Sequence, residues 1–451
     1  MTERDLENRP RTVAVIGGGL AGCECAWRLA RSGIAVRLFE MKPGRFSPAH
    51  SSPSLAELVC SNSLRSDEPE SAVGLLKLEM TDLESLVMAA ARATRVPAGK
   101  ALAVDRELFA QWITRCIRDE SLITLVREEI RTLDDPKLRK TDVVVVAAGP
   151  LTGEELADDL CRKVGTDHLY FYDAIAPIVN ADSIDMNVAF WGSRYNPEEH
   201  DYLNCPMDEQ TYRQLHAELL AARKVPARDF EKALHFEACL PIETLAERGE
   251  MTMAFGPLKP VGLVDPRTGT QPFAVVQLRA ENRDKNAFNL VGFQTKLAYP
   301  EQERVFRLIP GLEQAEFLRL GSMHRNTYVD APAALTPDLE LRTQPGVFLA
   351  GQITGVEGYV ESAACGLWLG HALAARLQGR HLPPPPPETA LGALLLHLRT
   401  PAKNFQPSNV NFGLMPELKA RGKKAQRKAL RAQRAREEWV KWKKRATIDQ
   451  S

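Results

Sequence analysis

The chain has little cysteine, and none of it forms a Cys-x-x-Cys pair. Eight cysteines in 451 residues are too sparse for a disulfide framework, so a reducing compartment such as the cytoplasm fits best. No His-x-x-x-His is present, which disfavours a closed zinc site, and no metal is expected. Apolar runs of about 20 residues, the length that spans a bilayer, are also missing. The start, MTERDLENRP, is too polar for a secretory signal, and no membrane association is expected.

Net charge is absent overall, but the two signs are unevenly distributed. The formal net charge is zero. The tail, residues 417–451, is nevertheless dominated by Lys and Arg, opposed mainly by Glu437 and Glu438. A basic tail on an acidic body predicts either a polyanionic partner or a solvated helix. Trp439 and Trp442 would share one helix face, where they could stack on nucleic acid or pack the tail back onto the body.

A dinucleotide-binding fingerprint stands near the start. The β-branched run 13–16 leads into a G-x-G-x-x-G pattern, a segment with helical periodicity and a second strand that ends in an acid. In this pattern the glycines permit a tight turn, close approach to a pyrophosphate and close helix packing, while the acid accepts from a ribose hydroxyl. The cofactor is therefore expected at Gly17, Gly18, Gly19, Leu20, Ala21, Gly22 and Glu40.

Two later segments favour FAD as that cofactor. TDVVVVAAGP (141–150) ends a buried strand in a glycine turn, and GVFLAGQITGVEGYVES (346–362) begins a second strand, turn and helix. Gly351 and Gln352 are expected to approach the cofactor. No second G-x-G-x-x-G follows, so NADPH or NADH would bind without a Rossmann domain of its own.

These patterns predict an α/β fold, in which a Rossmann-like, two-part FAD-binding domain carries an inserted α+β domain. Between about 180 and 325, short strand-like runs alternate with polar loops. The expected boundaries are 1–180 and 326–416 for the FAD-binding domain, 181–325 for the insertion and 417–451 for the tail. Residues 103–133 are expected to be mainly helical, with Asp105 as the N-cap.

Two cysteines stand out from the rest. Cys60, in AELVCSNSLR, precedes a Ser/Asn-rich loop with Arg65 nearby, which would favour a thiolate; a small buried hydrophobic residue is the competing interpretation. Cys239, in HFEACLPIE, is followed by a proline that disfavours helix. The side chains of four other cysteines are expected to lie in the hydrophobic core: Cys23, Cys25, Cys116 and Cys365.

A polar cluster precedes the return to the FAD-binding domain. In MHRNTYVDAP, the side chains of His324, Arg325 and Asn326 could bind phosphate or carboxylate, or could be hydrogen-bonded in the connection between domains. Both interpretations are open on the residues alone.

Several stretches together resemble the TrmFO family of folate- and FAD-dependent tRNA uracil-C5 methyltransferases. They run in family order over nearly the whole chain and include VAVIGGGLAG, AELVCSNSLR, FEACLPIE, GPLKPVGLVDPRTG, MHRNTYVDAP, AGQITGVEGYVESAACG and FQPSNVNFGLMP. The resemblance implies that 5,10-methylenetetrahydrofolate donates one carbon through flavin N5, with electrons from NAD(P)H. The implied acceptor is uridine 54 of the tRNA T-loop, held by the basic tail and the active-site cleft.

The resemblance also implies catalytic roles. Cys239 is the expected nucleophile at uracil C6, because addition there makes C5 nucleophilic. Cys60 is expected beside the flavin, removing the C5 proton or protecting the one-carbon adduct. Lys296 stands where the family pattern has a histidine expected to stack on folate, and the chain also departs from the pattern at Ser51, Lys100 and Ala238. These departures leave open a ribosomal RNA acceptor. A flavin thiol-redox oxidoreductase and a non-catalytic RNA-binding flavoprotein are two rival functions.

Overall fold

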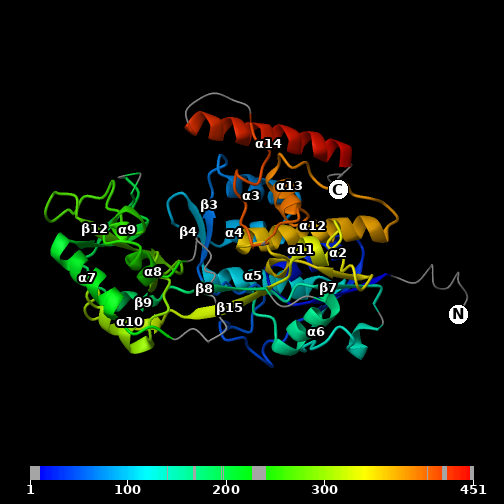
Figure 1. Ribbon diagram of the computed structural model, residues 1–451, viewed down its shortest axis with the longest axis horizontal. Coiled ribbons are helices and arrows are strands. Elements are labelled where there is room, and N and C mark those ends of the chain that lie inside the picture. Colours follow the sequence, from blue (N-terminus) through cyan, green and yellow to red (C-terminus); the bar gives the residue numbers. More distant parts are fainter. Residues whose placement is uncertain are drawn as a thin grey trace, which may run out of the picture.

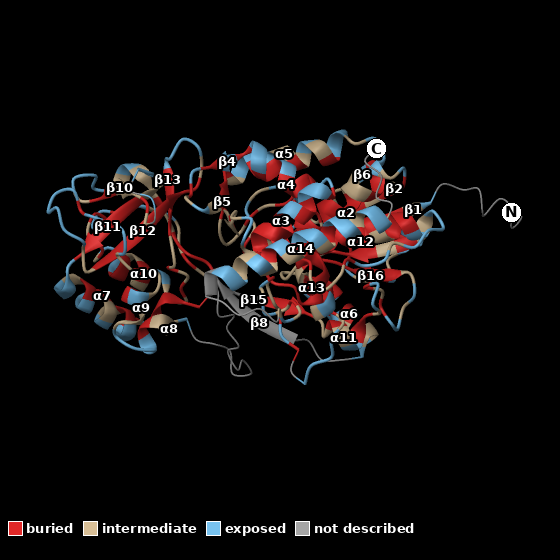
Figure 2. Ribbon diagram, turned by 90° about the horizontal axis from the view of Figure 1, so that it is seen from above, coloured by how far each residue is buried: buried red, intermediate tan, exposed pale blue. Residues whose placement is uncertain are grey.

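The fold is described by a computed structural model. It covers residues 11–139, 141–165, 169–194, 196, 198–225, 240–403, 405–418 and 424–446, with side chains left undescribed at 169–174, 323–325 and 424–425. Two halves lie side by side, each with a buried core (Figures 1 and 2). No helix among the described residues is both long enough and apolar enough to cross a bilayer.

The larger half is built on a parallel sheet of five strands in the order β16-β7-β1-β2-β6. Every neighbouring pair runs parallel, and β1 lies at the centre with four of its five residues buried. This arrangement confirms the predicted Rossmann-like α/β class. The strands are β1 (Thr12–Ile16), β2 (Ala35–Phe39), β6 (Ile123–Val126), β7 (Val143–Val146) and β16 (Val347–Leu349).

Two helices from opposite ends of the chain, α2 (Leu20–Arg31) and α12 (Tyr359–Leu377), pack directly on each other. Gly366 permits this contact, because a Cβ there would lie 2.1 Å from the Ala21 carbonyl oxygen. The remaining helices of this half are α3 (Ala72–Asp82), α4 (Leu86–Ala93), α5 (Arg106–Asp119), α6 (Glu154–Val164), α11 (Ala331–Ala334) and α13 (Ala390–His397), with 3₁₀ turns η1 (Pro136–Leu138) and η4 (Gln352–Thr354).

A small antiparallel sheet, in the order β3-β5-β4, follows the first βαβ unit. Its strands are β3 (Ser63–Ser66), β4 (Arg95–Val96) and β5 (Ala101–Val104). Asp105 caps α5 as predicted, accepting the Leu108 N–H. The expected helix over 103–133 is wrong beyond residue 119. There Glu120 turns to extended backbone, and β6 pairs with β2 because its apolar residues complete the parallel sheet.

The smaller half is an antiparallel sheet of six strands in the order β10-β11-β12-β13-β9-β14, joined to the larger half through the two-stranded ribbon β8-β15 (Figure 1). Its strands are β9 (Ile178–Asn180), β10 (Phe190–Gly192), β11 (Tyr202–Met207), β12 (Ala274–Ala280), β13 (Ala287–Leu290) and β14 (Phe317–Arg319). The ribbon is β8 (Leu169–Ala174) and β15 (Met323–Tyr328), and the helices are α7 (Glu209–Ala221), α8 (Ile242–Glu247), α9 (Thr252–Phe255), α10 (Tyr299–Phe306) and η2 (Ala181–Ser183).

The basic tail forms α14 (Lys424–Ala446), which lies across α3 and α13 (Figure 1). Trp439 and Trp442 are only 3% exposed, and their indole N–H groups donate to Asp82 Oδ2 (2.8 Å) and the Pro383 carbonyl (3.0 Å). The indoles therefore anchor the tail to the body. Of the two alternatives, packing onto the body is confirmed and stacking on nucleic acid is wrong, because both indoles are buried, with Trp442 against Trp368 and Trp439 against Trp442.

Buried carboxylates join distant helices in the larger half. Glu79 on α3 accepts from the N–H groups of Ala390 (2.8 Å) and Leu391 (2.7 Å), and so caps α13. Glu24 on α2 caps α4 in the same way, through Leu86 and Val87. Burial raises the pKa of Glu79 to about 8 and that of Glu24 to about 7.

Glu79 makes stability depend on pH. Its folded pKa of about 8 lies above the ordinary 4.5, so the folded state retains a proton that the unfolded state releases. Its contribution is complete below pH 4.5 and is lost as the pH rises to about 8. We expect Glu79→Gln to have a lower free energy of unfolding than wild type at pH 5.5, because one hydrogen bond to the N-terminus of α13 is lost. We expect this difference in unfolding free energy to shrink by pH 8. Denaturant unfolding at both pH values measures this, and a gap that widens with pH contradicts it.

Candidate cofactor-binding and active site

The fingerprint loop has the geometry that a dinucleotide requires. Gly17 has φ +105°, and a Cβ there would lie 2.5 Å from the Ala147 carbonyl oxygen. Gly22 packs so closely that its Cβ would meet the Gly17 carbonyl at 1.9 Å. Gly19 faces open space and begins α2 without a side-chain cap, which leaves the first N–H groups of the helix available to an anion.

Glu40 lies beside this loop at the end of β2. Its carboxylate accepts from the backbone N–H groups of Gly18 (2.8 Å) and Lys42 (2.9 Å). Each carboxylate oxygen has a second lone pair, so Glu40 can hold the loop and still accept from a ribose hydroxyl.

A cavity of about 350 Å³ opens from the fingerprint and is lined by segments from both ends of the chain. The predicted residues that line it are Gly17, Gly18, Gly19, Leu20, Ala21, Glu40, Cys60, Asn326, Gly351 and Gln352. Gly358, also in the lining, immediately precedes α12, which therefore begins without a side-chain cap. The buried Ser362 Oγ, also in the lining, has no hydrogen-bond partner among the described residues. Two uncapped helix starts and an unpaired hydroxyl fit a bound phosphate-bearing flavin nucleotide.

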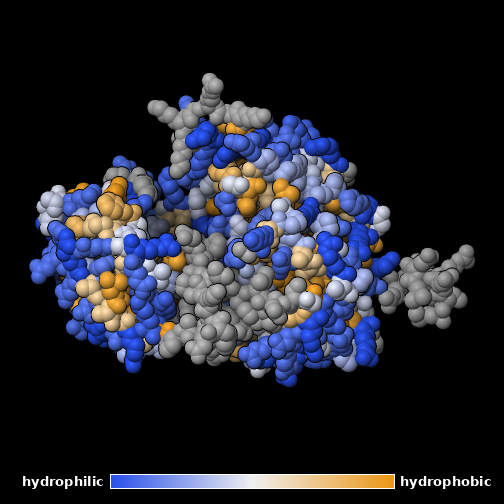
Figure 3. Space-filling model, viewed as in Figure 1, coloured by the Kyte–Doolittle hydropathy of each residue, from blue (hydrophilic) through white to orange (hydrophobic). Residues whose placement is uncertain are grey.

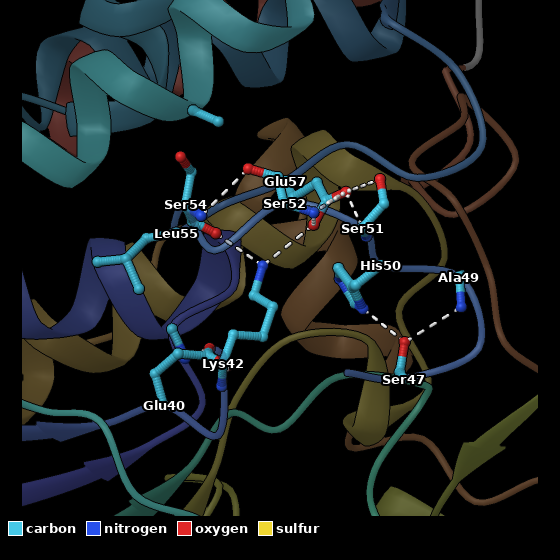
Figure 4. A network of polar contacts seen from close by, with 12 residues as sticks. Glu40, Lys42, Ser47, Ala49, His50, Ser51, Ser52, Ser54, Leu55 and Glu57 are labelled. Carbon is cyan, nitrogen blue, oxygen red and sulfur yellow. Dashed lines mark hydrogen bonds and ion pairs between the residues drawn. The ribbon is translucent and has the colours of Figure 1, made fainter. Parts of the chain in front are cut away.

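A polar network stiffens the loop between Glu40 and Glu57 along one wall of the cavity (Figure 4). Lys42 Nζ donates to Glu57 Oε2 (3.1 Å) and to the Ser54 carbonyl (2.6 Å). His50 Nδ1 lies 2.6 Å from Ser47 Oγ, and burial lowers the pKa of His50. Burial alone would raise the pKa of Glu57. The hydrogen bond from the Ser51 N–H and the charge of Lys42 outweigh it, so the pKa is lowered.

Cys60 lies half-buried in the cavity wall against Tyr359, the first residue of α12. The Tyr359 hydroxyl accepts the Cys60 N–H at 2.8 Å and lies 3.0 Å from its sulfur. Burial raises the pKa of Tyr359 well above its ordinary value, with the Cys60 charge as a second cause, so the phenol keeps its proton. The neutral Cys60 thiol donates to the same oxygen, and the phenol can donate to the sulfur once the thiol has lost its proton, so the pair can exchange a proton.

Three guanidinium groups, those of Arg106, Arg279 and Arg319, are near enough to the thiol to interact with it electrostatically. Arg65, the cation expected beside Cys60, lines the cavity but forms an ion pair with the buried Glu361. Positive charge of this kind favours the thiolate form of a cysteine.

The remaining expected site residues lie in different positions. Cys239 is outside the described residues, and so are the side chains of His324 and Arg325, whose backbone lies in β15. Asn326 is buried at the cavity. Lys296 does not line the described cavity, although its neighbour Gln294 does, and its backbone N–H donates to Glu243 at 2.7 Å.

Several site residues escaped the sequence reasoning. Tyr359 stood in a recognised glycine-rich stretch, but nothing local indicated that it would meet Cys60, 299 positions earlier. Arg106 and Arg279 carry no motif at all. Among the described residues, no cluster of three or more His, Cys, Asp or Glu side chains is arranged to hold a metal ion.

Comparison with known proteins agrees with this geometry. The model of the family described as Glucose inhibited division protein A matches residues 12–381. A solved structure of Aquifex aeolicus GidA superposes with a TM-score of 0.71 at 17% identity, covering 98% of this chain and 74% of that one, which supports the fold.

Curated relatives are much closer in sequence. The methylenetetrahydrofolate–tRNA-(uracil-5-)-methyltransferase TrmFO of Nitratidesulfovibrio vulgaris is 68% identical over 433 residues, covering 96% of this chain and 90% of that protein. The protein of the same name from Geobacter sulfurreducens is 58% identical over 432 residues, covering 95% and 98%. These matches confirm the resemblance seen in the motifs, and the chain belongs to the TrmFO family.

Proposed function

We propose that this protein is an FAD-dependent methyltransferase that forms 5-methyluridine in tRNA with 5,10-methylenetetrahydrofolate as the carbon donor. The observation that carries the proposal is one cavity lined by the dinucleotide fingerprint, by the Gly351–Gln352 turn and by the Cys60–Tyr359 pair. A dinucleotide site alone would suit many oxidoreductases. A thiol with a proton-bearing partner and nearby guanidinium groups adds the means to move a proton and to stabilise an anionic base.

The chain's own residues would hold FAD in a defined orientation. The N-terminus of α2 and Gly19 would bind the pyrophosphate, Glu40 the ribose, and the start of α12 the ring end. When bound and reduced by NADPH or NADH, FAD supplies the ring that takes up the one-carbon unit from methylenetetrahydrofolate. Around that ring the cavity wall excludes water, which would otherwise hydrolyse a reactive one-carbon group.

We assign the two cysteines different duties. Cys239 adds to C6 of the uracil and makes C5 nucleophilic, as the family motif implies. Cys60, aligned by Tyr359, removes the C5 proton or protects the one-carbon adduct from water. Asn326 lines the same cavity. We assign it to the folate or base pocket, together with His324, Arg325 and Lys296, as the sequence motifs suggest.

The acceptor we propose is uridine 54 in the T-loop, because an unpaired loop base leaves its stack at a lower cost than a duplex base. The surface along α14 is mostly hydrophilic (Figure 3) and carries exposed cations suited to phosphate. We infer a cytoplasmic location from the tRNA substrate. We also infer a division into an FAD-binding domain (1–180 and 326–416), an inserted domain (181–325) and a tail (417–451), joined through β8 and β15.

The activity can be measured directly. With FAD, methylenetetrahydrofolate, NADPH and unmodified tRNA, we expect 5-methyluridine in wild type, none in Cys239→Ala, and at least about a hundredfold less in Cys60→Ala, since a positioned proton-transfer group contributes that much. Cys116→Ala is the matched control, because this half-buried thiol on α5 does not line the cavity. Mass spectrometry of digested tRNA gives the yield.

Three outcomes would contradict this assignment. A wild-type yield of 5-methyluridine from Cys239→Ala would show that Cys239 is not the nucleophile. Product on ribosomal RNA transcripts but not on tRNA would change the acceptor. Rapid NADPH-dependent reduction of disulfides without any need for folate would indicate a thiol-redox oxidoreductase instead.

The last turn of α14 tests the tRNA-binding surface. We expect the Lys444→Ala/Arg445→Ala double variant to bind tRNA more weakly and to lose about one to two units from the slope of log Kd against log salt, because each lost phosphate contact removes about 0.9. The matched control is Arg162→Ala/Lys163→Ala in the last turn of α6. Equal slopes in both variants would contradict the proposed role of α14.

A further inference from the structure

The segment that carries Cys60 is held from two sides. On one side, Tyr359 of the FAD-binding half accepts the Cys60 N–H. Two arginines hold the residues on either side of Cys60. Arg279 of the six-stranded sheet binds the residues after it, and Arg106, which pairs with a residue at the end of that sheet's β12, binds the residues before it. The thiol therefore lies where the two halves of the molecule meet.

Arg279 on β12 binds the residues after the thiol. Its guanidinium, 7% exposed as a residue, donates to Asn62 Oδ1 through Nε (2.8 Å) and to Ser61 Oγ through Nη2 (2.8 Å). The planar fork of an arginine makes this two-point contact directional. Asn62 is fully buried and donates in turn to the carbonyls of Val104 and Ala280, each at 2.9 Å, so it ties β5 to β12.

Arg106 binds the residues before the thiol. Its Nη1 donates to the Leu58 carbonyl at 2.6 Å. Its Nε and Nη2 are 2.9 and 2.7 Å from Glu281 Oε2, one residue beyond the end of β12. Glu281 is buried, and breaking a buried pair would leave an uncompensated charge, so the pair couples the position of Arg106 to that of the inserted half.

We propose that Arg279 and the Glu281–Arg106 pair are positioning residues through which the inserted half sets the place of the Cys60 thiol against Tyr359. The inference rests on the proposed function only in taking Cys60 as a working thiol. Because one strand end supplies both contacts, a change in the angle between the two sheets shifts both flanks of Cys60 together. Alignment of the thiol is thereby linked to the placement of the inserted half.

If these contacts only stabilised the packing of the two halves, the expected result would differ. Breaking them would lower stability but would leave the reactivity of Cys60 unchanged in the folded protein. Arg283 provides the matched control, since it too crosses between the halves. Its side chain donates to the Ala93 carbonyl and its backbone N–H donates to Asp105 Oδ2, yet it does not touch the Cys60 segment.

The test is alkylation of Cys60 by iodoacetamide in FAD-loaded full-length protein, followed by mass spectrometry of the Cys60 peptide relative to the Cys116 and Cys161 peptides. On the high-pH plateau of alkylation, where the thiol is ionised in every variant, we expect Arg279→Met to raise the Cys60 rate about tenfold or more, because both hydrogen bonds from Arg279 to the Cys60 segment are lost. Arg283→Met is expected to keep the wild-type rate. The alkylation rate of Arg279→Lys is expected to lie between those of wild type and Arg279→Met, since an ammonium lacks the two-point fork.

Two further measurements separate positioning from folding and from the proposed function. Ser61→Ala removes one acceptor of Arg279 at a half-buried position and is expected to raise the rate in the same direction when the proteins are compared at equal FAD content. In methyl transfer, Arg279→Met is expected to lower kcat while KM for tRNA stays within about twofold. Wild-type alkylation rates in the folded Arg279→Met and Ser61→Ala variants overturn the proposal. Absence of 5-methyluridine with wild-type enzyme overturns the proposed function and leaves the alkylation result standing.

Discussion

The site depends on one close contact, that of α12 on α2. Gly366 has no side chain to separate the helix from the Ala21 backbone, so the last large helix of the sheet domain lies directly on the first. That contact brings the start of α12 to the cavity that begins at the fingerprint loop. Cys60 gains Tyr359 as a partner only because α12 begins there. A larger residue at 366 would push apart the two surfaces between which a cofactor lies.

Local patterns predicted the parts of the site that depend on local backbone. Asp105 caps α5 as predicted, and the fingerprint glycines and Glu40 lie together at one loop, because turn geometry and helix capping involve residues close in sequence. Tyr359 and Arg279 could not be found in this way, since their roles arise from contacts between residues hundreds of positions apart. Trp442 shows a related limit: helical spacing predicted a shared face, but only the packed structure reveals which surface covers that face.

Buried titratable groups fix the placement of distant elements in several places. Glu24 and Glu79 each accept the first N–H groups of a distant helix, and Lys77 donates to the Arg65 and Ser66 carbonyls. Burial lowers the pKa of Lys77 to about 7. Such groups are satisfied only when the partner element is correctly placed, so they specify one arrangement of helices rather than adding much net stability. Arg279 extends the same principle across the boundary between the two halves.

The central position of β1 has a consequence for synthesis on the ribosome. β1 must pair with β7 and lies two strands from β16, which ends at residue 349, while α14 closes over α3 only after residue 424 has emerged. The N-terminal strand therefore waits for most of the chain before its sheet is complete. Chains truncated early would expose the apolar β1–β2 edge, which makes nascent fragments natural clients for chaperones.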